Sequence, residues 1–213
     1  VYKRQGPFWL KKINAGAVTT STMAGYAFAK INFRGRNILF IAYLATMMIP
    51  SQVTLIPKFV MFTEMNLMGT HLTLILPGII SVTGTFLMRQ YFMQIPDDLK
   101  ESAYIDGANE FKIWLRIMIP IAKPAMASLA MIVFLWNWNN YLDALVFLSD
   151  WRLYTIPVAL TNFIEESSTQ YNLIMAASAS ALIPVFVVFL AGQKFFVKGL
   201  MAGCLLYTSP SPR

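Results

Sequence analysis

The chain has 213 residues, of which 57% are hydrophobic and 13% charged, and its mean hydropathy is +0.56. Because soluble domains carry about 25% charged and about 45–50% apolar residues, this composition excludes an ordinary soluble domain and indicates a membrane protein. The formal net charge is +7, but the basic residues fall in short loops and form no stripe with stacking aromatics, so we expect no nucleic-acid partner. A single cysteine, Cys204, and a single histidine, His71, exclude a disulfide framework and a thiolate or histidine metal cluster within one chain.

The two ends of the sequence differ in character from the rest. Residues 1–5 and 204–213 resemble translated sequencing-adapter readthrough, and the chain shows neither a starting Met nor a signal-peptide pattern. We therefore expect both ends to be adapter-derived and residues 6–203 to form one membrane domain. We also expect the natural N-terminus of this domain to be missing.

Five uncharged stretches predict membrane-spanning helices, because a span needs about 20 largely apolar residues. The first is rich in Ser, Thr and Gly, and such small residues let helices approach closely in lipid. Prolines in later stretches are tolerated because neighbouring helices can satisfy the carbonyls that proline frees. The stretches are residues 13–29, 37–57, 72–88, 125–142 and 173–192. We predict an all-α membrane protein, a polytopic helical bundle with five spanning helices here and a sixth, missing first helix in its parent.

The basic residues of the loops predict the orientation of the bundle. If the spans alternate, most of these residues fall on one side, which the positive-inside rule places in the cytoplasm. Segments 31–36, 89–124 and the C-terminus are then cytoplasmic, and segment 150–171 faces outward. The cytoplasmic set is Lys30, Arg34, Arg36, Arg89, Lys100, Lys112, Arg116, Lys123, Lys194 and Lys198, against Lys11, Lys12, Lys58 and Arg152 outside.

A polar insert, residues 96–120, separates the third and fourth predicted spans. Asp97 suits the positive end of a helix, and Gly107 can end that helix because glycine accepts a positive φ. Asn109 can cap a second helix that runs through Met118. We therefore expect a knob of two short helices around a glycine elbow. It is too polar to lie in lipid.

The spacing within this insert is specific, and it closely resembles the EAA loop of the permease subunits of bacterial ABC importers. Ser102 stands where the motif has its second alanine, and Ile119 stands where it has leucine, both small changes in bulk. The residues that carry the resemblance are Glu101, Ser102, Ala103, Gly107, Ile117, Ile119 and Pro120.

Further motifs occur in the same order as in maltose-type sugar permeases. Residues 24–36 resemble the second helix of those proteins and its cytoplasmic exit, and residues 48–57 resemble the end of their third helix. Residues 138–142 are similar to a Trp-Asn-Glu/Asp-Tyr-Leu pattern, although Asn140 stands where an acidic residue is common. Residues 193–203 resemble the C-terminal tail. The chain thus resembles the smaller, maltose-permease-G-like subunit of the carbohydrate branch of type I ABC importers.

This resemblance implies a set of partners and a mechanism. A second permease subunit completes the path through the bacterial inner membrane, two ATPase subunits bind on the cytoplasmic side, and an extracytoplasmic solute-binding protein delivers the sugar. ATP binding closes the ATPases and moves the docked loop, which rocks the helices from an inward-facing to an outward-facing state. Hydrolysis takes place on a separate chain. This multi-pass chain would therefore be no enzyme and would bind no cofactor.

The resemblance also implies roles for residues of the loop. Glu101 would make a polar contact in the ATPase groove, and Ser102 belongs to the same motif. Ala103 and Gly107 would allow close approach of the two surfaces, and Asp106 would cap or orient the elbow. The alternative interpretation is a pair of amphipathic surface helices without a partner.

A cluster of aromatic and amide side chains follows the fourth predicted span. Trp136, Asn137, Asn139 and Asn140 could contact a sugar through stacking and amide hydrogen bonds. They could equally form an interfacial aromatic belt whose polar members bond between helices. Their position late in the span, near the outer surface, favours the belt.

Three other functions remain open. The first is a type I importer for another solute, such as a polyamine or glycerol phosphate. The second is an intramembrane enzyme, but no nucleophile, base or metal cluster is evident inside the spans. The third is an ion-coupled transporter, which would need intramembrane carboxylates or broken helices, and the spans hold almost no charge. The sequence has no Walker-type glycine loop, which argues against ATP binding by this chain.

Overall fold

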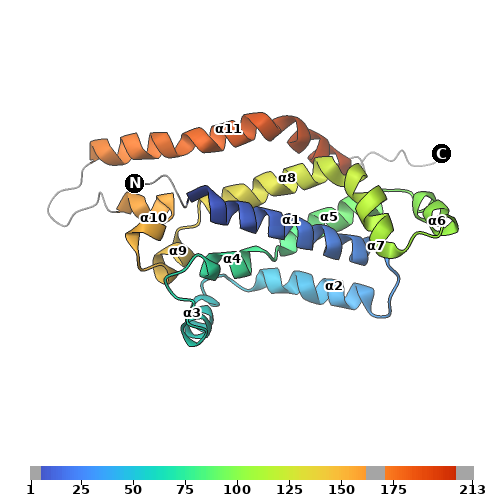
Figure 1. The fold of residues 1–213 in the computed structure, drawn as a ribbon, viewed down its shortest axis with the longest axis horizontal. Helices are drawn as coiled ribbons and strands as arrows, with labels where there is room; N and C mark the ends of the chain where they lie inside the picture. The colour runs from blue at the N-terminus through green and yellow to red at the C-terminus, as the bar shows by residue number, and fades with distance from the viewer. Residues whose placement is uncertain (1–5, 162–170, 205–213) are drawn as a thin grey trace, which may run out of the picture. The chain divides into compact units, whose positions relative to one another are not determined.

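The computed structural model of the protein describes residues 6–161 and 171–204, and it describes side-chain surroundings for residues 8–161 and 171–193. The described residues form helices joined by turns, with no β-strand among them, as Figure 1 shows. The predicted all-α fold is confirmed. Residues 1–5, most of 204–213 and part of the predicted outward segment lie outside the described residues.

The chain divides into two compact units, each built from segments that are far apart in the sequence. Unit 1 comprises Val1–Gly16, Ile49–Ile80 and Met131–Ala191, and unit 2 comprises Ala17–Met48, Ser81–Ala130 and Gly192–Arg213. Helices α1 (Gly6–Lys30), α8 (Ile119–Trp138) and α11 (Tyr171–Cys204) contribute residues to both.

Aromatic side chains hold unit 1 together. Phe62 and Phe147 are both buried, and their rings meet edge to face with centroids 5.2 Å apart. The Gly69 amide donates to the Phe147 carbonyl at 2.9 Å, and the His71 ring stacks on Trp9 with centroids 5.8 Å apart. The short helices of unit 1 are α3 (Leu55–Glu64), α4 (Leu72–Gly78), α9 (Leu142–Phe147), η3 (Trp151–Leu153) and α10 (Ile156–Leu160).

Close packing of α1 against α5 (Val82–Met93) organises unit 2. A Cβ atom added to Gly25 would lie 2.7 Å from the Met88 Cβ and 2.9 Å from the Arg89 backbone nitrogen. One added to Gly84 would lie 2.5 Å from the Ser21 Oγ. The remaining elements of unit 2 are α2 (Arg36–Ala45), η1 (Thr46–Met48), α6 (Asp98–Ile105), α7 (Glu110–Ile113) and η2 (Trp114–Met118). The Gly, Ser and Thr content of the first predicted span thus reflects a helix contact, as close approach in lipid requires.

Three helical stretches within the described residues are long and apolar enough to cross a membrane: Leu72–Met93, Glu110–Trp138 and Tyr171–Gln193. They overlap the third, fourth and fifth predicted spans, although the first of them consists of two helices, α4 and α5, with residues 79–81 between them. Helix α1 is 25 residues long and includes the first predicted span, residues 13–29. It is less apolar than the three stretches above.

The second predicted span, residues 37–57, is not one helix. The apolar helical stretch Arg36–Met48 ends before Pro50, and α3 begins only at Leu55. Proline lacks an N–H and its ring clashes with the carbonyl four residues earlier, so it ends a helix in this way. Hydropathy alone predicted a longer span than the backbone allows.

Candidate functional site

The predicted glycine elbow of the 96–120 insert is present in unit 2, between α6 and α7. Gly107 has a φ of 74°. Its N–H donates to the Tyr104 carbonyl at 2.9 Å, and the Ala108 N–H donates to the Ala103 carbonyl at 2.9 Å. These two bonds form a Schellman motif, which satisfies carbonyls at the end of α6. The Asn109 side chain accepts from the Lys112 N–H at 2.9 Å, so the predicted cap of the second helix is confirmed.

The second helix of the insert runs through Met118 as predicted, but it does not end there. Helix α7 ends at Ile113, and a five-residue π-helical turn, Trp114–Met118, joins it to α8 without a break. Pro120 explains the wider turn, because its ring would clash with the Arg116 carbonyl in a regular α-helix. Pro120 therefore lies inside a continuous helix and does not separate the insert from the span.

Four of the five predicted coupling residues lie on the outer surface of the insert. Glu101, Ser102, Asp106 and Gly107 are exposed, whereas Ala103 is buried, with 7% of its surface accessible. The Ser102 hydroxyl donates to the Asp98 carbonyl of its own helix at 2.5 Å. Large apolar side chains flank the four exposed residues, since Ile105 is 87% and Phe111 61% exposed. We call this surface the outer face of the loop.

The opposite side of the insert carries contacts that the sequence analysis missed. Lys30, the last residue of α1, is buried, and its Nζ donates to the Ile95 carbonyl at 2.5 Å and to the Asp97 carboxylate at 2.6 Å. The hydrogen bond and positive charge of Lys30 hold the pKa of Asp97 below its usual value. Asp97, predicted to serve the N-terminus of α6, makes no side-chain capping bond and binds α1 instead.

Glu110, the first residue of α7, is the centre of a second group of contacts. Its carboxylate accepts from the Lys100 Nζ at 2.9 Å and from the hydroxyls of Tyr104 and Tyr26. The bond to this carboxylate is the main reason that the pKa of Tyr104 is raised. Lys100 also donates to the Lys30 carbonyl at 2.5 Å. We call Tyr26, Lys30, Asp97, Lys100, Tyr104 and Glu110 the inner-face network.

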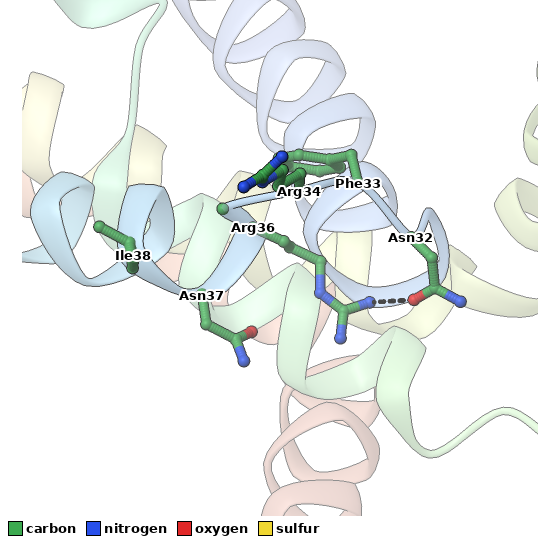
Figure 2. A pocket seen from close by; sticks show the side chains of 7 residues that line it. Asn32, Phe33, Arg34, Arg36, Asn37 and Ile38 are labelled. Carbon is green, nitrogen blue, oxygen red and sulfur yellow. Dashed lines mark hydrogen bonds between the residues drawn. The ribbon is translucent and has the colours of Figure 1, made fainter.

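The turn between α1 and α2 continues from the same end of α1, and Figure 2 shows the open pocket that it lines. Arg36 Nη1 donates to the Asn32 Oδ1 at 2.9 Å, while Arg34 is exposed and Gly35 has a φ of 85°. All the residues that line this pocket belong to residues 32–38. The turn therefore adds positive charge beside the inner-face network.

The aromatic and amide cluster lies in unit 1, apart in sequence from the insert. The Asn137 and Asn139 amides donate to the carbonyls of Val133 and Leu135, at 2.8 and 2.9 Å, and so satisfy the end of α8. Asn140 donates to Asp143 at 3.4 Å. Trp136 is 57% exposed, so of these four residues its side chain is the one that offers a broad surface to another molecule.

Comparisons with known proteins agree with this architecture. The family described as binding-protein-dependent transport system inner membrane component matches residues 18–201. The chain is 37% identical over 183 residues to the arabinooligosaccharides transport system permease protein AraQ of Bacillus subtilis. The aligned region covers 86% of this chain and 65% of AraQ. It is 35% identical over 206 residues to the sn-glycerol-3-phosphate transport system permease protein UgpE of Salmonella typhimurium, covering 92% of the chain and 73% of that protein. The chain thus spans just under two thirds of the length of AraQ.

Solved structures share the fold. Among them is the crystal structure of a bacterial ABC transporter involved in the import of the acidic polysaccharide alginate, with a TM-score of 0.74 and 24% identity. The match covers 92% of this chain and 77% of that one. At this identity the likeness concerns the fold.

Proposed function

This chain belongs to the family of binding-protein-dependent transport system inner membrane components, and from that premise we propose that it is the permease subunit of an ATP-driven importer of a sugar or oligosaccharide. It forms half of the translocation path. It couples to an ATPase through the outer face of the loop around Glu101–Gly107. ATP hydrolysis takes place on the partner chain, and this chain binds no cofactor and no nucleic acid.

The observation that carries the proposal is the outer face of the loop. Glu101, Ser102, Asp106 and Gly107 are exposed beside Ile105, whose apolar side chain is 87% exposed. A polar patch around an exposed aliphatic residue suits docking into a groove of another protein. Ala103 is buried within unit 2 and does not belong to the exposed patch. In this family such a partner is the ATPase.

The remaining partners follow from the family and the apolar helices. A second permease subunit, two ATPase subunits and an extracytoplasmic solute-binding protein complete the importer in a bacterial inner membrane, which this chain crosses several times. Helix α11 supports this arrangement. Its apolar stretch has a mean hydropathy of 2.5, and none of it is buried against the described part of the chain. Lipid or the second permease covers such a surface in the membrane.

Two substrate classes have support. The name of AraQ favours an oligosaccharide, and the exposed Trp136 ring offers a stacking surface for a sugar. The amides of Asn137, Asn139 and Asn140 already donate hydrogen bonds within the chain. They can bind substrate in the proposed translocation path only if these bonds break. The name of UgpE, at 35% identity, favours glycerol 3-phosphate as the second candidate.

The test is ATP-dependent uptake by the assembled importer in proteoliposomes. We expect uptake of labelled arabino-oligosaccharides, with sn-glycerol 3-phosphate as the second probe. A cysteine at Ile105 should crosslink to the ATPase subunit, and a cysteine at the exposed Tyr171 of unit 1 is the matched control that should not. If the Ile105 cysteine does not crosslink to the ATPase and neither probe is taken up with ATP, the proposed function is refuted.

A further inference from the structure

The inner-face network joins three segments that are distant in sequence. Tyr26 and Lys30 come from the last turn of α1, Lys100 and Tyr104 come from α6, and Glu110 opens α7. The pairs Tyr26–Glu110, Lys100–Lys30 and Lys30–Asp97 lie 84, 70 and 67 residues apart. The network therefore determines where the loop lies on unit 2.

The charges of the network balance. It contains two ammonium groups, Lys30 and Lys100, and two carboxylates, Asp97 and Glu110. The Lys30 side chain is 5% exposed, and a charge so buried needs close partners. Its two partners, the Ile95 carbonyl and the Asp97 carboxylate, both lie in the segment that leads into α6. The buried charge at the end of α1 is thus satisfied only while α6 remains in place.

Lys100 gives α6 a contact with the end of α1 in return, so each helix depends on the other. The last carbonyls of a helix lack partners within the helix, and a cation is favoured at that negative end. Lys100 of α6 supplies both a donor and a charge, since its Nζ lies 2.5 Å from the Lys30 carbonyl. Glu110 then holds Lys100 at 2.9 Å. Helix α1 is in turn packed tightly on α5 through Gly25, so the attachment reaches the body of unit 2.

We infer that Glu110, acting with Lys100 and Lys30, is a positioning residue that fastens the coupling loop to the end of α1, so that a displacement of α6 moves α1 with it. The inference rests on the proposed function for its role in transport. The outer face of the loop receives the partner, and the inner-face network passes its movement to the helix. In this arrangement Glu110 acts through Lys100 and Lys30 and is not one of the four residues that define the outer face.

The attachment itself can be tested without transport. Spin labels are placed at two exposed positions of unit 2, Met23 on α1 and Ile105 on α6, with Cys204→Ser removing the native cysteine. We expect a narrow distance distribution in the otherwise unchanged protein and a broad one in Glu110→Gln, which keeps the size of the side chain and removes its charge. Glu64→Gln, at an exposed position of α3 in unit 1, is the matched control and should leave the distribution narrow. Equal widths in the Glu110 variant and the control overturn the inference.

The second measurement uses the assembled importer in proteoliposomes. Glu110→Gln should still purify with the ATPase and hydrolyse ATP, while solute transported per ATP falls roughly tenfold, as loss of a charge-assisted hydrogen bond allows. Lys100→Met should lower the transport ratio in the same way, and Lys100→Arg should keep it. The double variant that combines Glu110→Gln with Lys100→Met should transport as much solute per ATP as the poorer of the two single variants. An unchanged transport ratio in Glu110→Gln, or loss of the ATPase from the complex, overturns the inference. Failure of the unmodified importer to take up solute would instead count against the proposed function.

Discussion

The two sides of the loop differ in how they are built. The outer face consists of four exposed residues close in sequence, Glu101, Ser102, Asp106 and Gly107, and the Ser102 hydroxyl is satisfied by its own helix. The inner face consists of side chains from three segments, with a buried ammonium group at its centre. The difference indicates separate roles for the two faces, because exposed local residues can adapt to a partner, while a charged network centred on the buried Lys30 ammonium group favours one arrangement. Substitutions on the two sides should therefore fail in different ways.

The largest effect is expected beneath the inner face, at the contact of α1 with α5. In Gly25→Val the new Cβ would meet Met88 Cβ at 2.7 Å and the Arg89 backbone nitrogen at 2.9 Å, and backbone cannot move aside as a flexible side chain can. We expect a loss of about 3 kcal/mol or more in the free energy of unfolding and little protein in the membrane. Membrane yield and thermal stability in detergent measure it. A stable, abundant Gly25→Val protein would show that the two helices do not pack in this way.

A smaller loss is expected when the buried ammonium group is removed. Lys30→Met leaves the Ile95 carbonyl without its donor, whereas the Asp97 carboxylate, 69% exposed, can turn to water. We therefore expect a loss of about 1–3 kcal/mol, the cost of one unsatisfied buried group, and not that of an isolated buried charge. The exposed Glu101→Gln should change stability by less than about 0.5 kcal/mol. Chemical unfolding of the two variants measures both changes in the free energy of unfolding. Equal losses would show that the two faces do not differ in their contribution to stability.

Local rules predicted the elbow and the cap of the loop, and the short range of these rules explains what they missed. The elbow at Gly107 and the cap at Asn109 follow from conformational preferences of single residues within a few positions. Asp97 lies 67 positions from Lys30, and Glu110 lies 84 positions from Tyr26, and no periodicity or charge pattern links such positions. The loop motif was found through family resemblance, while its inner attachment needed the fold. The interrupted 37–57 stretch was missed for a different reason, because the prediction gave hydropathy more weight than the local effect of Pro50 on the helix.

Gly107→Asp tests the outer face, with an internal control. Gly107 and Gly69 both have a positive φ, 74° and 71°, and a Cβ at either would meet nothing within 4 Å among the described residues. Aspartate should cost each site about 1–2 kcal/mol of backbone strain. We expect only Gly107→Asp to uncouple transport, because Gly107 lies on the outer face while Gly69 lies in unit 1. Uptake and ATPase stimulation of both variants, at equal membrane levels, measure this; identical behaviour would assign the effect to strain.

The smallest effect concerns the pH dependence of the Lys30–Asp97 pair. The pKa of Asp97 in the folded protein is lowered from its ordinary value of 3.8, chiefly by the Lys30 hydrogen bond, so the pair stabilises the fold above pH 3.8. This contribution is lost as the pH falls through the lowered pKa and the carboxylate gains its proton. Because Asp97 is largely exposed, solvent and salt screen the pair, and Asp97→Asn should lower the melting temperature at pH 6 by only a few degrees. Melting curves of both proteins should converge below pH 3.8 and in high salt. A difference that persists at low pH would mean that packing at Asp97, and not its charge, holds the inner face to α1.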